Sequence, residues 1–234
     1  MSRTLSSHPV TTRWPARNPT VLQLYSFPTP NGVKISIALE EMGLAYEPHL
    51  VTLSDADVKS DAFLALNPNN KIPAIIDPNG PDGQQIELFE SGAILLYLAE
   101  KTGQFLSSDP KTRIETIQWV MFQMGGVGPM FGQLGFFHKF AGAAMEDKTA
   151  RDRYANEAKR LLNVIETRLE GRDWMMGDYS IADMALAPWL NALDFYGAKE
   201  ITGADQLKNV PAYIDRFYAR PAVQRAKNIP ARPE

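Results

Sequence analysis

NPNNKIPAI at residues 67–75 and, after a turn rich in Gly and Pro, FESGAI at residues 89–94 are the stretches that decide the fold of this chain. The Ile72–Pro73 pair stands at the mouth of a short apolar strand, and an X–Pro bond is where a chain can keep a cis peptide. A cis bond there would turn the main chain of Ile72 outward, where an extended ligand could pair with it in strand-like fashion. The sequence therefore predicts a peptide-binding turn.

The second stretch predicts an anion site at the start of a helix. Its strand ends at Glu90–Ser91, and a helix is expected from Gly92 onward. A carboxylate, a hydroxyl and the N–H groups of a first helical turn would then converge, which suits a ligand that carries both a carboxylate and an ammonium. A γ-glutamyl peptide has this pattern.

Length and composition exclude several classes of function. The chain has 234 residues, 44% of them hydrophobic, which is enough for two small domains, and its net charge of −3 without a long Lys/Arg run argues against a nucleic-acid partner. Cysteine is absent and the three histidines lie far apart, so no disulfide and no metal site is predicted. Any sulfur chemistry must come with a ligand. No long apolar run or signal-peptide core occurs, so we expect a cytoplasmic protein without a membrane span.

The elements around the two stretches predict an α/β thioredoxin-like domain. Strands are expected at 21–25 and 46–53 with a helix over 31–42 between them, and a less regular helix at 55–66 precedes a hairpin of 74–76 and 86–89. Residues 93–98 are apolar on every side, which predicts a helix buried on both faces.

Beyond residue 110 the patterns are helical. Helices are expected at 111–124, 149–169, 180–192 and 211–219. The predicted organisation is a flexible N-terminal arm at 1–18, a thioredoxin-like ligand-binding domain at 19–102, a linker at 103–110 and an all-helical domain at 111–234.

The Ser180–Asp183 segment predicts a structural role for its acid. It is typical of a capping box at a helix start, although Asp is shorter than the usual Glu or Gln. Asp183 could equally be buried and hold a neighbouring loop.

At this point the chain resembles the cytosolic glutathione transferases over residues 20–228. The resemblance rests on TPNG at 29–32, Ile72–Pro73, Glu90–Ser91 and the helix cap at 180–183, and GGVGPM at 125–130 supports it. Within that family the motifs are most similar to the bacterial Nu class, which is itself similar to the yeast nitrogen-regulation prion protein. The resemblance implies the glutathione transferase fold, a homodimer, glutathione as co-substrate and glutathione-dependent disulfide reduction.

The resemblance also implies roles for individual residues. It places Thr29 and Asn31 beside the sulfur as catalytic residues, the Ile72 main chain against the cysteinyl part, and Glu90 with Ser91 on the γ-glutamyl end. The implied glutathione-binding set is Lys71, Ile72, Pro73, Glu90, Ser91 and Arg153. The implied second-substrate pocket is Phe136, Phe137 and His138.

Several alternatives stay open. The segment from Thr29 to Gly32 could be only a turn and a helix cap, because the same residue types favour both. Tyr25 could activate the sulfur in place of Thr29, or it could be core packing. Val58 aligns where relatives can carry a polar glutamine, and a valine side chain offers no such polar contact.

Three functions fit the sequence. In the first, glutathione reduces a disulfide and supplies both the attacking and the resolving thiol, so the partners are glutathione or glutathione disulfide and a small-molecule second substrate. In the second, the glutathione thiolate is conjugated to an apolar electrophile. In the third, the protein is a non-catalytic regulatory protein that binds glutathione.

Overall fold

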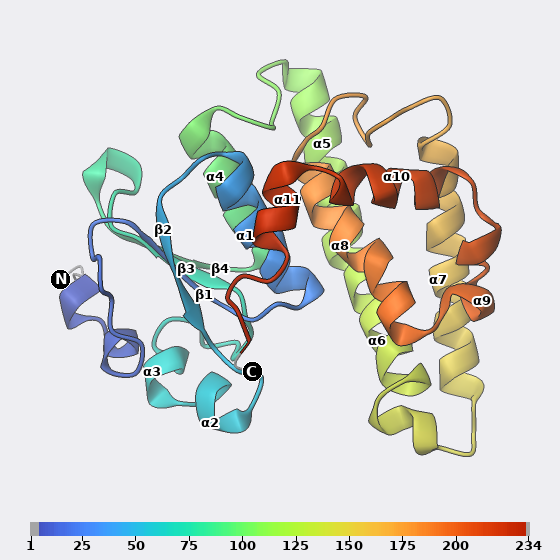
Figure 1. Ribbon diagram of the computed structural model, residues 1–234, viewed down its shortest axis with the longest axis horizontal. Coiled ribbons are helices and arrows are strands. Elements are labelled where there is room, and N and C mark those ends of the chain that lie inside the picture. Colours follow the sequence, from blue (N-terminus) through green and yellow to red (C-terminus); the bar gives the residue numbers. More distant parts are fainter. Residues whose placement is uncertain (1–4, 233–234) are drawn as a thin grey trace. The chain divides into compact units, whose positions relative to one another are not determined.

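The computed structural model describes residues 5–232 and divides the chain into two compact units (Figure 1). The first unit holds the chain up to Thr102 together with the segment from Pro221 onward, and the second is Gly103–Arg220. We expected the helical domain to run from residue 111 to the end of the chain, whereas the final segment groups with the first unit. The reason is helix α11 (Pro221–Ala226), which packs on α1 (Pro30–Glu41), where the Ser36 hydroxyl donates to the Ala226 carbonyl at 3.0 Å.

A sheet of four strands organises the first unit, in the order β2-β1-β3-β4. The strands are β1 (Leu22–Ser26), β2 (Tyr46–Leu50), β3 (Ala74–Asp77) and β4 (Ile86–Phe89). Strand β1 is parallel to β2, and β3 is antiparallel to both β1 and β4. This is the predicted thioredoxin-like arrangement.

The helices of the first unit follow the prediction with two differences. Instead of one helix at 55–66 there are two short ones, α2 (Asp55–Val58) and α3 (Asp61–Leu64), because Ser60 interrupts them and caps the second by accepting the Phe63 N–H at 3.2 Å. Helix α4 (Ser91–Thr102) buries Ile94 and Leu98, but Ala93 is exposed. The prediction that residues 93–98 are buried on both faces is therefore wrong for the described chain.

The arm before the sheet is docked, which corrects the prediction of a flexible segment at residues 1–18 for its described part. Residues Leu5–Ser7 and Pro9–Thr12 form short 3-10 turns, and Leu5 and Val10 are buried in one cluster with Tyr25 and Phe63. Residues 1–4 lie outside the described part. The Ser/Thr/Arg-rich composition concealed the few apolar side chains that anchor the arm.

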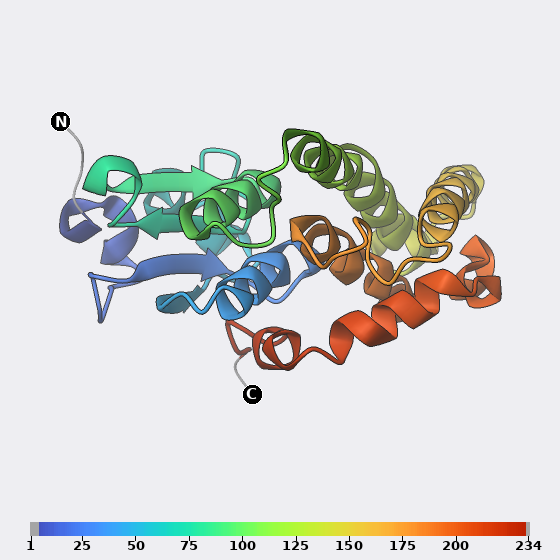
Figure 2. The same ribbon diagram turned by 90° about the horizontal axis from the view of Figure 1, so that it is seen from above.

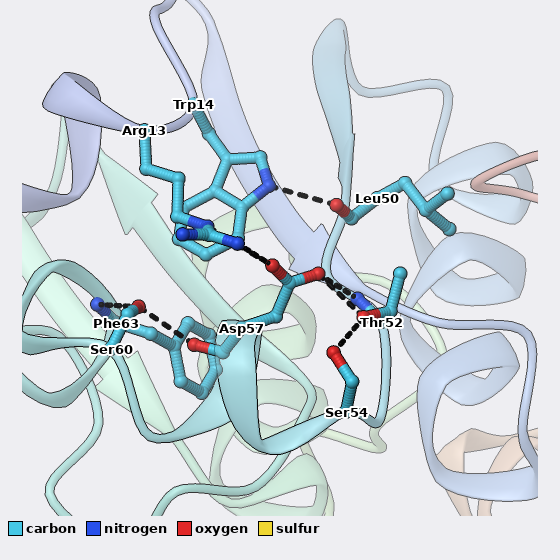
Figure 3. A network of polar contacts seen from close by, with 8 residues as sticks. All are labelled: Arg13, Trp14, Leu50, Thr52, Ser54, Asp57, Ser60 and Phe63. Atoms are coloured by element: carbon cyan, nitrogen blue, oxygen red, sulfur yellow. Dashed lines mark hydrogen bonds and ion pairs between the residues drawn. The ribbon is translucent and has the colours of Figure 1, made fainter.

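Polar contacts complete this docking at Asp57 (Figure 3). Arg13 points at the Asp57 carboxylate, with its Nε 3.0 Å from Oδ1, and the Trp14 indole donates to the Leu50 carbonyl at 2.8 Å. The Thr52 N–H and hydroxyl donate to Oδ2 at 2.8 and 2.6 Å. Burial alone would raise the pKa of Asp57, but the hydrogen bonds from Thr52 and Arg13 lower it. The arm is thus tied to α2 through Asp57 and to the end of β2 through Leu50.

The second unit is helical, as predicted. Its helices are α5 (Pro110–Phe122), α6 (Gly128–His138), α7 (Thr149–Arg168), α8 (Ile181–Tyr196), α9 (Lys199–Thr202) and α10 (Asn209–Tyr218). A π-helical stretch, Gln123–Val127, joins α5 to α6, and Figures 1 and 2 show α6 beside α7. Sequence reading missed α6, because its glycines and aromatic residues obscure the helical period. No helix within residues 5–232 is long and apolar enough to cross a membrane.

Asp183 performs both structural roles considered for it. It forms the capping box with Ser180, whose N–H donates to Oδ2 at 2.8 Å, and it holds the preceding loop through the Met175 N–H at 2.9 Å. The Tyr213 hydroxyl donates to Oδ1 at 3.0 Å. Burial raises the pKa of Asp183 to about 6, although these hydrogen bonds oppose the rise.

Candidate functional site

Three separate segments of the first unit meet at one pocket. They are the start of α1, the loop before β3 and the start of α4. The residues that line the pocket are Asn31, Asn67, Asn69, Lys71, Ile72, Pro73, Glu90 and Ser91. The fold thus brings together both stretches singled out in the sequence and one of the two proposed sulfur-side residues.

The side chain of Asn67 shapes the loop before β3. It is buried, its amide donates to the Lys71 carbonyl at 2.6 Å, and its Oδ1 accepts the Asn69 N–H at 2.9 Å. The bond between Ile72 and Pro73 is cis, as the sequence predicts. Within residues 5–232 the main-chain N–H and C=O of Ile72 form no hydrogen bond, so they are available to an extended ligand.

The turn into α4 has an unusual backbone at Glu90. Its φ is +71°, in the left-handed region where a residue with a side chain is strained by roughly 1–3 kcal/mol. Ser91 follows as the first residue of α4 and is buried, whereas Glu90 is exposed. This turn places a carboxylate, a hydroxyl and the N–H groups of a helix start at the pocket, which is the predicted convergence.

Thr29 and Asn31 form the start of α1. The Thr29 hydroxyl accepts the Gly32 N–H at 3.3 Å, so Thr29 is a helix cap, and its own O–H can still donate to a ligand. The cap and the sulfur contact are therefore compatible roles. A Cβ at residue 32 would stand 1.9 Å from the Phe27 carbonyl oxygen, so this cap accepts only glycine there. Asn31 lines the pocket, and Thr29 lies two residues before it.

Lys34 is the residue of the site that sequence reasoning missed. Its side chain is fully buried, and its Nζ lies 2.9 Å from Asn31 Oδ1 and 3.2 Å from Ser91 Oγ. Burial lowers the pKa of Lys34 to about 7, and the nearby charge of Glu90 opposes that effect. A lysine one helical turn after Asn31, flanked by the apolar Val33 and Ile35, was the available signal.

Tyr25 belongs to the core of the first unit. It is 0% exposed and stacks on His49 with ring centroids 4.6 Å apart. Burial raises the pKa of Tyr25, with a smaller contribution from Glu47, so its hydroxyl stays protonated. Val58 is packed in the same core cluster. The geometry favours the core reading of Tyr25 over sulfur activation.

Lys71 is exposed and lines the pocket. The other residues predicted to contact a ligand, Arg153, Phe136, Phe137 and His138, lie in the second unit. Arg153 is exposed on α7, and Phe137 stacks on Tyr154 with centroids 5.7 Å apart. His138 Nε2 lies 3.2 Å from the Gly197 carbonyl, and Phe136 contacts Phe137 edge-on. Their roles toward a ligand stay predictions. In the part of the chain that the structure describes, no group of His, Cys, Asp and Glu could hold a metal ion.

Comparisons with known proteins agree on one family. The protein-family model "Glutathione S-transferase, N-terminal domain" matches residues 20–100, and the family model "Glutathione S-transferase, C-terminal domain" matches residues 127–221. The chain is 48% identical to the disulfide-bond oxidoreductase YfcG of Escherichia coli K12, covering 88% of this chain and 94% of the relative. It is 41% identical to the disulfide-bond oxidoreductase YghU of the same organism, and the match covers 89% of this chain and 74% of YghU.

Solved structures agree with these matches. A glutathione transferase from Pseudomonas putida, with one glutathione disulfide bound per subunit, superposes with a TM-score of 0.96 at 59% identity, covering 98% of this chain and 100% of that one. A glutathione transferase from Burkholderia graminis, with two glutathione molecules bound per subunit, has a TM-score of 0.95 at 61% identity, over 100% and 98%.

Proposed function

Since this chain belongs to the glutathione S-transferase family, we propose that it is an enzyme that uses the thiol of glutathione to reduce disulfide bonds. The observation that carries the proposal is the pocket where Asn31, Ile72 and Ser91 meet. It offers main-chain groups for a peptide, a helix start for a carboxylate, and an amide for a sulfur.

The reaction needs two glutathione molecules. One thiolate attacks a sulfur of the disulfide substrate, which forms a mixed disulfide and releases the first thiol. A second glutathione thiolate attacks the glutathione sulfur of that intermediate, which releases the second thiol and forms glutathione disulfide. The chain has no cysteine, so both thiols come from glutathione. The relatives that hold two glutathione molecules, or one glutathione disulfide, support this scheme.

The protein's contribution is to favour the thiolate, because the thiolate is the nucleophile and a free thiol has a pKa of about 8.5. In our proposal the Thr29 hydroxyl and the Asn31 amide donate hydrogen bonds to the sulfur. The helix dipole at the N-terminus of α1 stabilises the thiolate by roughly 0.3–1 kcal/mol. Lowering the thiol pKa toward neutral pH raises the fraction of reactive glutathione.

Other residues hold the rest of the tripeptide in this proposal. The Ile72 main chain pairs with the cysteinyl part, Pro73 shapes that turn, and Glu90 and Ser91 bind the γ-glutamyl end. Lys71 and Arg153 bind carboxylates of the ligand. The proposal further includes a Nu-class assignment, a homodimer with two-fold symmetry, a cytoplasmic location, and a glutathione-binding domain at 19–102 joined by the linker 103–110 to the helical domain.

A second activity is favoured by the aromatic residues of the second unit. Phe136 is 41% exposed beside the stack of Phe137 on Tyr154, and with His138 these side chains would form the second-substrate pocket. Such a surface suits an apolar guest. Conjugation of glutathione to an apolar electrophile is therefore the alternative function.

A paired assay separates these functions. The pure protein is given glutathione with either 2-hydroxyethyl disulfide or 1-chloro-2,4-dinitrobenzene. We expect the disulfide to be reduced much faster than the chlorinated ring is conjugated. Faster conjugation would make the protein a conjugating transferase, and binding of glutathione without either reaction would make it a regulatory protein.

A further inference from the structure

Lys34 contacts both halves of the proposed ligand site from within the first unit. It lies on α1, is 0% exposed, and its Nζ is within hydrogen-bond distance of Asn31 Oδ1 and Ser91 Oγ. Asn31 and Ser91 belong to different helices, and both line the pocket. One buried group thus links the residue proposed for the sulfur with the residue proposed for the γ-glutamyl end.

The chemistry of an ammonium group determines how these two partners are oriented. An ammonium has three donors and no acceptor, so the Asn31 atom that it contacts must be the amide oxygen. The two N–H groups of that amide are then directed away from Lys34. The Ser91 oxygen likewise accepts from Lys34 at 3.2 Å, so the serine O–H is directed away from the ammonium.

We propose that Lys34 is a positioning residue that orients Asn31 toward the glutathione sulfur and Ser91 toward the γ-glutamyl carboxylate, and that it takes up a proton when the ligand binds. This inference rests on the proposed glutathione function, because the two groups it orients are those proposed to hold glutathione.

Proton uptake follows from the burial of Lys34. Burial lowers the pKa of its amine to about 7, so a large part of the free protein carries a neutral amine above neutral pH. A neutral amine has a lone pair and can accept a hydrogen bond from the Ser91 hydroxyl, which would withdraw that donor from the ligand. An anionic ligand in the pocket favours the ammonium, so binding raises the pKa of Lys34 and draws a proton from solvent. By linkage, the ammonium in turn strengthens binding.

The charged neighbours of Lys34 are compatible with this coupling. Glu90 favours the ammonium. On the helices packed against α1, Lys101 of α4 pairs with Asp77, and Arg225 of α11 pairs with Glu40. Glu100 on α4 and Lys227, the residue after α11, are exposed to solvent.

Calorimetry with S-methylglutathione tests the inference without turnover. This analogue keeps the γ-glutamyl group but has no ionisable thiol. Binding enthalpies measured near pH 8 in buffers of different ionisation enthalpy give the number of protons taken up. The variants are Lys34→Met, which keeps the bulk and removes charge and donors, and Lys59→Met as a matched control at an exposed lysine.

We expect the full-length wild type and Lys59→Met to take up roughly 0.3 proton or more per ligand, and Lys34→Met to take up much less. Lys34→Met should also bind S-methylglutathione about tenfold more weakly at pH 7. In a Ser91→Ala background the same substitution should have a smaller effect, because Lys34 acts partly through Ser91. Equal proton uptake and equal affinity in wild type and folded Lys34→Met would overturn the inference.

Two further outcomes keep the test decisive. If Lys34→Met does not fold, Lys34→Gln and the wild type alone suffice, because binding to wild type without proton uptake contradicts the inference by itself. If the wild type does not bind S-methylglutathione at all, the proposed glutathione function fails, and the inference about Lys34 fails with it.

Discussion

Two buried ionisable side chains, Lys34 in the first unit and Asp183 in the second, show how differently this protein uses a charge. Both are 0% exposed and lie near the start of a helix, Lys34 as the fifth residue of α1 and Asp183 as the third residue of α8. Asp183 accepts four hydrogen bonds, all from the surrounding protein: the Met175 N–H, the Ser180 N–H and hydroxyl, and the Tyr213 hydroxyl. Lys34 donates to two residues that line a pocket. The comparison indicates that the partners of a buried charge, more than its burial, separate a structural role from a functional one.

The largest expected effect is on Asp183. Asp183→Ala leaves buried donors without an acceptor, so the free energy of unfolding should fall by about 3–5 kcal/mol. Tyr213→Phe, which removes one donor only, should cost about 1 kcal/mol. Denaturant unfolding measures both. Glutathione affinity of the folded protein should stay unchanged, and a stable Asp183→Ala protein that cannot bind glutathione would reverse the comparison.

Ser91→Ala should have the next largest effect, on binding. Loss of a hydrogen bond to the charged γ-glutamyl end should weaken glutathione binding by about 1–3 kcal/mol, measured by calorimetry on the folded variant. Ser36→Ala is the matched control, because it also removes a buried serine hydroxyl of the first unit, yet Ser36 faces Ala226. An unchanged dissociation constant in Ser91→Ala would refute the γ-glutamyl assignment.

Thr29→Ala and Asn31→Ala test whether Asn31, a partner of Lys34 in the pocket, and Thr29 act on the glutathione sulfur, with disulfide reductase activity as the measurement. Loss of about 1.4 kcal/mol of transition-state stabilisation would lower disulfide reductase activity about tenfold in each variant. The activity profile of Thr29→Ala should move to higher pH, because an unassisted thiol ionises later. Tyr25→Phe is the control and should retain activity. The opposite pattern, with activity lost in Tyr25→Phe alone, would show that the sulfur site is misassigned.

The smallest effect concerns stability and pH at Lys34. Burial lowers its pKa to about 7, whereas a lysine in an unfolded chain has a pKa near 10.4. Between these values the unfolded chain holds a proton that the folded chain has released, so the free energy of unfolding rises with pH. Relative to Lys34→Met, the wild type should gain about 1 kcal/mol between pH 7 and pH 8. Chemical denaturation at both pH values checks this, and a constant difference would mean that Lys34 does not titrate there.

What the sequence predicted well depends on local signals. The turn at Ile72–Pro73, the helix start at Ser91 and the capping box at Ser180 all rest on residue types whose backbone preferences act over a few positions. The fold class followed from the order of those elements.

What the sequence did not predict depends on distant partners. Val10 docks the arm by packing in a core cluster, and Trp14 by donating to the Leu50 carbonyl, and both partners are distant in sequence. Lys34 was missed because lysine is ordinarily an exposed residue, and its burial depends on Asn31 and Ser91 coming together. The roles of Arg153 and Phe136 also depend on a partner that is not a neighbour in sequence, the ligand, and they stay predictions.

The most direct test of the central claim is the pKa of the glutathione thiol on the protein. Thiolate absorbance in the ultraviolet, followed as a function of pH for glutathione bound to the wild type and to Asn31→Ala, gives this value. We predict a bound thiol pKa clearly below the value of about 8.5 for a free thiol, and a rise toward that value in Asn31→Ala. A bound thiol that ionises like glutathione in solution in both proteins would contradict the claim that this pocket activates the sulfur.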